Sequence, residues 1–432
     1  MGHSQSDESE IIHYIEPSES SSVSRPRKRA EVQKLPEELL LYIFEFIAGD
    51  DHNVMDNVSF MMVCRLWDAL VRNTRALWST ISIALDCYSD ISSLCDQARA
   101  CIRYSENAML DIRVQIDSML DTDLEDDEDD PLEITTLEIE PIFRGYLNLI
   151  GVLLGEFGCN AWRWQSVSLW LASGLDDKIS LYILRSLAYQ MPNLRNLSIH
   201  LGYAPNTEIS WDAVQLLDIL PGLTSLRSLS VDHRFILRIH SFVPSLIVEL
   251  TLMDSPSVRE FFSIGSQFTA LQRLSVDLRD RNVISGRDVF LPALTYLKAS
   301  GWSPLELISH LMAEKLAYLD IADADFTASH LVGSIAYGSI TTLSWRSRDP
   351  TMMTGRTCNY ITLLAFMLVQ CSLLVEIRLW KKHRDVFEQA VTKARREGPV
   401  LKALRRLKIY GSCWEFNDQN LAEVINMSIP GD

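Results

Sequence analysis

Apolar residues recur along most of the chain in one short pattern, in which apolar positions are separated first by two variable residues and then by one. Nine segments follow it well, each followed by the number of its first residue: LRNLSI (194), LRSLSV (226), IVELTL (247), LQRLSV (271), LTYLKA (294), LAYLDI (316), ITTLSW (340), LVEIRL (374) and LRRLKI (404). The last two apolar positions flank a single variable one, which is the period of a β-strand with one buried face. The pattern therefore predicts a strand in each of these segments.

The segments return at a nearly constant interval in the middle of the chain. Those from 247 to 340 begin 24, 23, 22 and 24 residues apart, and toward either end the intervals are mostly 29 to 34 residues. Weaker copies are WSTISI (78), NAMLDI (107) and WQSVSL (164). The longer interval between the last two leaves room for one more irregular unit. Repetition at this period predicts stacked units that share a continuous core.

Several stretches between these segments have helical spacing. DAVQLLDILPGL (212–223) and ITLLAFMLVQC (361–371) are examples, as expected if the chain returns through a helix after a strand. The second lies in the longest uncharged run, Thr357 to Val375, which has nearly the length of a membrane span. That run contains polar residues such as Gln370, and a strand pattern begins inside it. We therefore expect a buried helix followed by a strand, and no membrane span.

Repeats with this pattern and spacing resemble a leucine-rich-repeat array, whose period is about 20–29 residues with one strand in each unit. The resemblance implies an α/β fold in which a parallel strand face runs along a solenoid and each unit is buried against its neighbours. The Asn or Cys that usually follows the strand is missing from all nine good copies. We therefore expect an irregular leucine-rich-repeat-like solenoid over residues 81–432, and not a uniform horseshoe.

A different pattern precedes the repeats, in the segment LPEELLLYIFEFI (35–47). Pro36 suits the first helical position, and Glu37 and Glu38 complement the positive end of the helix dipole. On a helix, seven apolar residues of this segment fall on an arc of about 200°: Leu39, Leu40, Tyr42, Ile43, Phe44, Phe46 and Ile47. A helix that faces one core needs an apolar stripe of about 100° or a little more, so this helix has apolar surface to spare.

The residues that follow complete a recognisable set over residues 31–80. Met61, Leu66 and Leu70 continue a helical pattern, and Trp78 closes a third short segment. The combined motif resembles the F-box: Leu35-Pro36-x-Glu38-Leu39, Ile43-Phe44, Val63-Cys64-Arg65-x-Trp67 and Leu77-Trp78. That resemblance implies a small three-helix domain that binds a Skp adaptor, which is linked to a cullin in a ubiquitin ligase. A downstream repeat domain would then recruit a protein substrate.

By this resemblance, the spare face of the first helix docks on the Skp adaptor. The implied adaptor contacts are Leu35, Pro36, Leu39, Leu40, Ile43, Phe44, Val63, Cys64 and Trp67. The link AGDDHNVMDN (48–57) is longer and more acidic than the common F-box spacing, so the resemblance does not define its conformation. The alternative is that Leu40, Ile43 and Phe44 are core residues of a larger domain and that Trp67 is a packing aromatic.

The variable positions beside the buried strand residues point to the opposite, concave side of the sheet, where a substrate could bind. They are mostly small and polar in the earlier repeats, and more basic and aromatic in the last three. The candidate substrate-binding residues there are Arg346, Arg378, Trp380, Arg406, Lys408 and Tyr410. Arg, Trp and Tyr are over-represented among binding hot spots, so this patch suits an acidic or phosphorylated protein segment. Alternatively, the strand cations only balance an acidic loop elsewhere in the chain.

Composition narrows the possible partners. The chain has 57 acidic and 40 basic residues, and its formal charge of −17 argues against general nucleic-acid binding and against attraction to anionic membranes. Its eight scattered cysteines include no CxxC pair, so we expect reduced thiols and a cytoplasmic or nuclear protein. Residues 1–30 are rich in Ser, Glu and Arg, which predicts a disordered tail.

A second polar tract lies at residues 117–133 and contains DTDLEDDEDD (121–130), with eight acidic residues in ten. Repulsion among so many like charges favours an open loop over packed structure. We interpret the tract as a solvated insertion between two structured units. The alternative is a docking strip for a basic partner.

No motif predicts catalysis or a cofactor. The sequence lacks GxxxxGK[ST], GxSxG, GxGxxG and HExxH, and its nine histidines do not cluster at metal-ligand spacing. HRD at 383–385 matches part of a kinase catalytic loop, but Ala390 stands where that loop has Asn and no DFG follows. We therefore expect a non-catalytic substrate receptor of a Skp–cullin–F-box ubiquitin ligase. The alternative is a leucine-rich-repeat scaffold that holds protein partners without ubiquitin transfer.

Overall fold

The structure is a computed structural model. It describes, with gaps between them, residues 35–48, 54–85, 89–116, 136–171, 189–201, 223–232, 244–253, 264–278, 288–301, 308, 310–322, 337–346, 357–380, 384–397 and 403–410. The predicted disordered tail (1–30), the predicted acidic loop (117–133) and nearly all of the predicted helix at 212–223 lie outside these residues.

The N-terminal unit is a group of short helices, as the sequence predicts. They are α1 (Glu37–Ala48), α2 (Val54–Met61), α3 (Arg65–Asn73) and the 3-10 turn η2 (Arg75–Trp78). The first helix begins one residue after the predicted start, because the carbonyl of Pro36 accepts the amides of Leu39 at 3.1 Å and Leu40 at 3.2 Å. Glu37 and Glu38 occupy its first turn, where negative charge complements the helix dipole.

Twelve parallel strands form one sheet in the order β1-β2-β3-β4-β5-β6-β7-β9-β11-β12-β13-β14. Their bounds are Thr80–Leu85, Leu110–Ile116, Trp164–Leu171, Asn196–Leu201, Ser228–Asp232, Glu249–Met253, Arg273–Leu278, Tyr296–Gly301, Tyr318–Ala322, Thr342–Arg346, Glu376–Trp380 and Arg406–Tyr410. Every one of the nine good pattern segments and the three weaker ones contains or overlaps one of these strands. The predicted α/β fold with a parallel strand face is therefore confirmed.

One weaker copy has a different phase from the one assigned by sequence. Ile112 pairs with Ile81 on β1 and with Val167 on β3, so Ile112 occupies the middle apolar position of its unit. The unit is thus MLDIRV starting at Met109, and not NAMLDI starting two residues earlier. Because β2 pairs directly with β3, no further strand lies between them, and the long interval contains helix α5 (Thr136–Leu154) instead.

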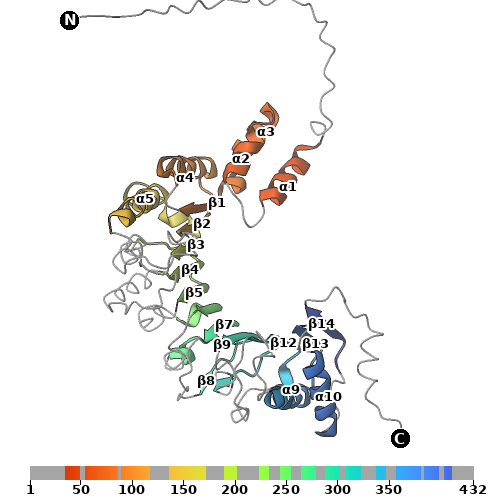
Figure 1. Ribbon diagram of the computed structural model, residues 1–432. Helices are drawn as coiled ribbons and strands as arrows, with labels where there is room; N and C mark the ends of the chain where they lie inside the picture. The colour runs from red at the N-terminus through yellow and green to blue at the C-terminus, as the bar shows by residue number, and fades with distance from the viewer. Residues whose placement is uncertain are drawn as a thin grey trace, which may run out of the picture.

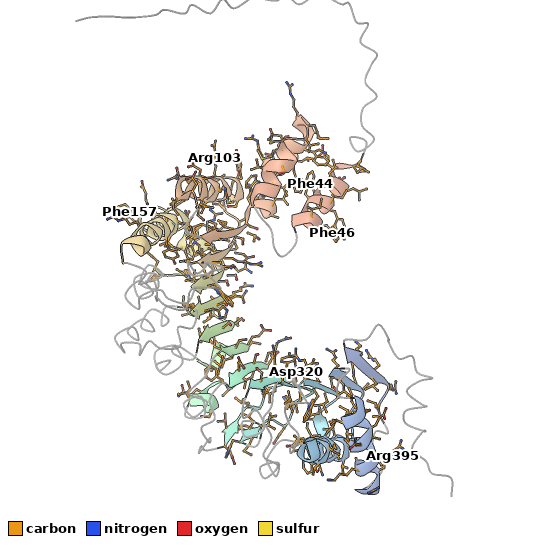
Figure 2. The ribbon with its side chains drawn as sticks, viewed as in Figure 1. Phe44, Phe46, Arg103, Phe157, Asp320 and Arg395 are labelled. Carbon is orange, nitrogen blue, oxygen red and sulfur yellow. The ribbon has the colours of Figure 1, made fainter. Side chains whose placement is uncertain are left out.

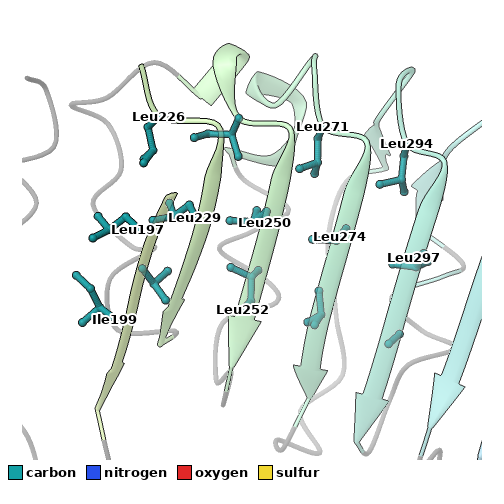
Figure 3. Packing of buried hydrophobic residues seen from close by; sticks show 14 of the residues in the cluster. Leu197, Ile199, Leu226, Leu229, Leu250, Leu252, Leu271, Leu274, Leu294 and Leu297 are labelled. Carbon is teal, nitrogen blue, oxygen red and sulfur yellow. The ribbon is translucent and has the colours of Figure 1, made fainter. Parts of the chain in front are cut away.

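The alternating residues of the strands form the core. Leu229, Leu250, Leu274 and Leu297 lie in register on neighbouring strands and are buried, with the next alternate residues below them (Figure 3). Each unit therefore buries its apolar row against the rows on both sides, as stacking requires.

A tight turn before many strands places the first apolar residue of the pattern. The amide of Leu226 donates to the carbonyl of Leu223 at 3.3 Å, and the amide of Leu294 donates in the same way to Leu291 at 3.2 Å. Equivalent bonds precede β4, β7, β11, β12 and β13. The two variable positions after the first apolar residue therefore carry the chain from this turn into the strand.

The strands follow an arc with helices on its outer side (Figure 1). These are α4 (Ile91–Ser105) and α5 near one end, and α9 (Thr357–Gln370) and α10 (Arg384–Glu397) near the other. Between them lie 3-10 turns and a small parallel pair, β8 (Val289–Phe290) and β10 (Leu311–Met312). This variety of connections matches the expectation of an irregular solenoid.

The long uncharged run folds as the sequence predicts. It forms α9, which leads through Leu374 into β13. One side of the helix is buried in the core, through Leu363, Leu364, Ala365, Met367 and Leu368. No helix within the described ranges is long and apolar enough to cross a membrane.

The helical unit joins the sheet without a linker. Only Ser79 separates η2 from β1. The buried Trp78 donates from Nε1 to the carbonyl of Val71 at 2.7 Å, and its ring lies 4.7 Å from that of Tyr104 on α4. Arg72 donates to Tyr104 Oη at 2.8 Å, which adds a polar contact between α3 and α4. The end of α3 and the turn η2 are therefore packed directly onto the first repeat.

Candidate functional site

The inward face of α1 forms a small aromatic core with the two helices after it. Leu40 and Phe44 are fully buried. The ring of Phe44 is stacked on Phe60 of α2 at 4.7 Å and meets Trp67 of α3 edge-on at 4.8 Å. Leu41 is half-buried against the same core. These contacts hold α1 on α2 and α3 and fix which of its faces remains outward.

The outward face of α1 is apolar and exposed. Its members recur at helical spacing, and we call them the α1 face: Leu39, Tyr42, Ile43, Phe46 and Ile47. Phe46 projects from the last turn of the helix and is 78% exposed (Figure 2). Exposed apolar groups that adjoin in this way mark interaction surfaces in proteins that are otherwise soluble.

The turn between α2 and α3 exposes a second apolar group. It consists of Met62, Val63 and Leu66, and Met62 is 83% exposed. Cys64, which precedes α3, is half-buried. Short helices that enclose a small core leave apolar side chains of this kind outside it.

The nine predicted adaptor contacts fall into three groups. Pro36, Leu39, Ile43 and Val63 are exposed, while Leu35, Cys64 and Trp67 are half-buried. Leu40 and Phe44 are fully buried and fill the small core, so we no longer count them among the candidate adaptor contacts. For these two residues the alternative interpretation as core residues fits the structure.

The predicted adaptor contacts also omit residues that the structure exposes. Tyr42, Phe46 and Ile47 belong to the predicted apolar arc but not to the predicted contacts. The signal was present in the spacing, because Tyr42, Ile43 and Phe46 follow Leu39 at three, four and seven residues. The spacing of Met62 and Leu66 in the sequence did not indicate that they are exposed. Only the fold of α2 and α3 shows that they face outward.

Four of the candidate substrate residues, Arg346, Arg378, Arg406 and Lys408, lie beside one of two carboxylates on the last strands. Arg346 pairs with Asp320 on the neighbouring strand, with Nη2 2.5 Å from Oδ2 and Nε 3.3 Å from Oδ1. The Asp320 side chain is only 6% exposed. This two-bond arrangement joins β11 to β12 and leaves the pair without net charge.

Glu376 of β13 organises the other cations. It accepts from Arg378 Nε at 2.7 Å, and both Arg406 Nη1 and Lys408 Nζ of β14 lie 3.4 Å from its oxygens. Its side chain is 8% exposed. We call these four residues the Glu376 cluster. One buried carboxylate thus holds three positive groups from two strands together.

The charge state of Glu376 follows from its neighbours. Burial alone would raise the pKa of its carboxyl, but the hydrogen bond and charge of Arg378, together with Lys408, outweigh burial and lower the pKa below its ordinary value. Glu376 is therefore ionised at neutral pH, and the cluster keeps two positive charges in excess.

Aromatic rings extend the cluster across the sheet. Tyr318 accepts from Arg378 Nη1 at 3.1 Å, and its ring is stacked on that of Tyr296 at 4.6 Å. The guanidinium of Arg273 lies 4.6 Å from the centre of the Tyr296 ring, and Arg273 also pairs with Glu249 at 3.3 Å. These residues were not among the sequence candidates. Alternation along each strand could have placed them on this face, but not in contact with Arg378.

Two candidates can be placed only by their backbone. Trp380 pairs with Tyr410 at the ends of β13 and β14, one alternation beyond Arg378 and Lys408. Their side chains lie outside the described residues. The register places their backbone positions in phase with Arg378 and Lys408.

The earlier repeats present a different concave surface. Trp170 of β3 is half exposed, and its ring lies 5.1 Å from that of His200 on β4. His200 Nε2 is 2.6 Å from Ser198 Oγ. The neighbouring outward positions carry small polar side chains such as Ser166 and Asn196. The described outward positions of β3 and β4 thus combine the exposed ring of Trp170 with small hydroxyl and amide groups, in contrast to the ion pairs of the last repeats.

Among the described residues we find no metal-binding group, and the most buried thiols are not reactive. The described residues contain no group of three or more His, Cys, Asp or Glu side chains that could hold a metal ion. Burial raises the pKa of the Cys101 and Cys371 thiols to about 12, so both are protonated and unreactive at neutral pH. The cysteines whose side chains the structure describes, Cys64, Cys95, Cys101, Cys159 and Cys371, are free thiols.

The comparisons with known proteins identify the helical unit. Residues 32–84 match the F-box-like family, a stretch that includes α1, α2, α3 and most of β1. No curated protein matches the sequence of the chain.

Among the solved structures that resemble this chain, two are examples of low similarity over most of its length. One is from the crystal structure of the yeast Rad7 and Elc1 complex, with 14% identity, 88% of this chain and 90% of that chain covered, and a TM-score of 0.34. The other is the leucine-rich repeat-containing protein LegL7 from Legionella pneumophila, with 12% identity, coverage of 81% and 99%, and a TM-score of 0.33. At these TM-scores neither supports an argument about this chain, and its repeat fold rests on its own parallel sheet.

Proposed function

We propose that this chain, whose residues 32–84 form an F-box-like domain, is the substrate-recognition subunit of a Skp–cullin–F-box ubiquitin ligase. In this role the F-box binds the Skp adaptor, the cullin is reached through the adaptor, and the repeats hold a protein substrate. The chain itself is non-catalytic, because ubiquitin transfer belongs to other subunits. The observation that carries the proposal is the uncovered α1 face inside the matched domain.

The α1 face has the chemistry of a permanent protein contact. Interfaces of stable complexes are more apolar than other surfaces and are formed around large buried side chains. The proposed adaptor contacts are therefore the exposed and half-buried members of the predicted set, extended by the rest of the exposed surface: Leu35, Pro36, Leu39, Tyr42, Ile43, Phe46, Ile47, Met62, Val63, Cys64, Leu66 and Trp67. Leu40 and Phe44 support this surface from below.

The repeats supply the second half of the proposed function. Parallel strands place their outward side chains on one curved face, and such faces bind extended or folded protein partners. Arg378, Trp380, Arg406, Lys408 and Tyr410 remain the proposed substrate contacts, whereas Arg346 is engaged by Asp320. The direct packing of Trp78 on Tyr104 favours a fixed position of the F-box on the repeats.

A co-purification experiment tests the adaptor contact. The full chain is expressed with a Skp adaptor as wild type, as Leu39→Asp/Phe46→Asp, and as Phe157→Asp. Leu39 and Phe46 are both exposed. Phe157 serves as the control because it is 97% exposed and follows α5, outside the F-box. We expect the double variant to lose the adaptor, since two carboxylates would be buried in an apolar contact, and the control to keep it. Adaptor retention by the double variant, with an unchanged melting temperature, would reject the α1 face.

A second measurement separates the receptor from the scaffold alternative. The purified chain with its adaptor is mixed with a cullin, ubiquitin and the remaining ligase components, and proteins that co-purify with the repeats are followed. A receptor should give ubiquitin conjugates on such a protein that disappear with Leu39→Asp/Phe46→Asp. Stable adaptor binding without cullin recruitment or conjugates would favour the scaffold.

A further inference from the structure

A connected line of side chains crosses the concave face of the later repeats, from β6 to β14. It runs through residues that each touch the next: Glu249, Arg273, Tyr296, Tyr318, Arg378, Glu376 and then both Arg406 and Lys408. Side chains that hold one another in place lose little rotamer freedom when a ligand arrives. Most side chains of the line are therefore already held in position before a ligand binds, and the side chains at one end are freer to move.

Those freer groups are the two cations of β14. Arg406 is 64% exposed and Lys408 is 47% exposed, whereas Arg378 is 29% exposed. Their contacts to Glu376 are long, at 3.4 Å, in comparison with the 2.7 Å bond that Arg378 makes. Arg406 and Lys408 can therefore turn toward an incoming anion, while Glu376 keeps Arg378 in place.

Charge balance indicates what this end of the line attracts. The Glu376 cluster has three cations and one carboxylate, so two positive charges are not neutralised within it. The chain as a whole carries a formal charge of −17, so an acidic ligand is repelled by most of its surface. An acidic ligand that binds at all should therefore bind at a local positive site such as this one.

The spacing of the cations favours separate carboxylates over a single phosphate. Arg406 and Lys408 are two residues apart on one strand and point to the same side, so their attachment points are about 6.6 Å apart. In an extended peptide, side chains at alternate positions have the same spacing. Two acidic residues at alternate positions would match both cations of β14.

We propose that this surface, centred on Tyr318, Arg378, Arg406 and Lys408, binds an extended segment of a partner protein with Asp or Glu at alternate positions. The inference rests on the proposed function, because the segment would belong to the recruited substrate. It moves the centre of the predicted patch toward β11 and β13 and leaves out Arg346, which is paired with Asp320.

The test is fluorescence anisotropy on the full chain, purified after co-expression with a Skp adaptor. The probe is a labelled Glu-Ser repeat peptide of about twelve residues, which is long enough to cross the line of side chains. A Gln-Ser peptide of the same length is the neutral control, and a Gln-Ser peptide with one central phosphoserine tests the phosphate source. We expect the Glu-Ser peptide to bind at least tenfold more tightly than either of the other two.

Matched pairs of variants test where on the protein the peptide binds. Arg406→Ala/Lys408→Ala should weaken the Glu-Ser peptide at least tenfold, and Arg395→Ala/Arg396→Ala should change its affinity less than twofold. The control removes the same charge from α10, the outer helix that carries Arg395 (Figure 2). Tyr318→Ala should weaken binding about fivefold, because it removes the hydroxyl that accepts from Arg378 Nη1. The melting temperature should be unchanged in all variants.

The outcomes separate this inference from the proposed function. Equal binding of the Gln-Ser peptide, preference for the phosphoserine peptide, or equal losses in the two double variants would each overturn the acidic-segment site. Adaptor co-purification is recorded in the same samples. If the adaptor is bound and the acidic peptide is not, the inference falls and the proposed function stands; if the peptide binds and the adaptor does not, the reverse holds.

Discussion

The α1 face and the Glu376 cluster are two outward surfaces of one chain with opposite chemistry. The first exposes large apolar side chains such as Phe46 and Tyr42 with no described residue over them. The second consists of charged groups that are already paired with one another around Glu376. An exposed apolar surface is stable in water only at a cost, so it suits a partner that stays bound. Paired charges are well solvated alone and suit a partner that comes and goes.

The difference follows from how each region builds its core. Three short helices bury only one side of α1, since the aromatic core of Phe44, Phe60 and Trp67 leaves no room for more. In the sheet, each inward residue of an interior strand lies between equivalent residues of two neighbouring strands. Aliphatic side chains are therefore buried by repetition, and mainly polar and aromatic side chains remain outside.

The largest expected effect is the difference in stability between substitutions on the buried side and on the exposed side of α1. Phe44→Ala should destabilise the helical unit by about 3–5 kcal/mol, because it leaves a cavity between Phe60 and Trp67. Phe46→Ala should change its stability by less than about 0.5 kcal/mol, because that side chain is exposed. Hydrogen exchange of peptides from residues 35–73 in the full chain measures both. Similar losses of protection in the two variants would contradict the assignment of core and surface.

The next largest expected effect is a difference in how strongly salt weakens binding at the two surfaces. Raising the ionic strength from about 0.05 to 0.5 M should weaken the acidic peptide at least tenfold, since Arg406 and Lys408 are exposed and screened. Adaptor binding through the α1 face should change less than about threefold, because apolar contacts are not weakened by screening. Both affinities are measured on one preparation. An adaptor contact as salt-sensitive as the peptide contact would mean that charges dominate the F-box surface too.

The third effect concerns the stability of the cluster itself. Glu376→Gln removes the carboxylate that three cations share, and we expect a loss of about 1–3 kcal/mol at neutral pH. Because the folded pKa of Glu376 lies below its ordinary value of 4.5, its contribution is complete above pH 4.5 and is lost as the pH falls through the lowered value.

Thermal melts of wild type and Glu376→Gln over a pH series measure that contribution. The difference in melting temperature should be constant near neutral pH and should shrink below about pH 4.5. Glu314→Gln, at an exposed position between β10 and β11, is the control and should differ little from wild type at any pH. A difference that grows on acidification would show that Glu376 is protonated in the folded protein.

The repeat fold was predictable from sequence because it depends on local alternation. Leu229, Leu250, Leu274 and Leu297 are buried wherever the pattern places them, since their neighbours repeat the same pattern. The phase of the copy around Ile112 was missed because two alternating registers fit a short segment equally well, and only pairing with Ile81 decides between them.

The surfaces were predictable only in part. The apolar arc of α1 was visible, but the division between Leu40 inside and Leu39 outside depends on where α2 and α3 pack, which spacing alone does not give. The cations of the last repeats were visible as well. Their partners were not, because Asp320 and Tyr318 lie far from Arg346 and Arg378 along the chain and meet them only across the sheet.

The smallest expected effect tests whether the neutral Asp320–Arg346 pair lies outside the acidic-segment site. Asp320→Asn/Arg346→Gln removes one positive and one negative group together, so the net charge of the concave face does not change. Replacing both partners of a pair leaves no uncompensated charge behind, and we expect a melting temperature within a few degrees of wild type. The affinity of the Glu-Ser peptide should change less than about threefold, in contrast to the tenfold loss with Arg406→Ala/Lys408→Ala. A tenfold loss in the neutral double variant would place Arg346 within the contact and extend the acidic-segment site across β12.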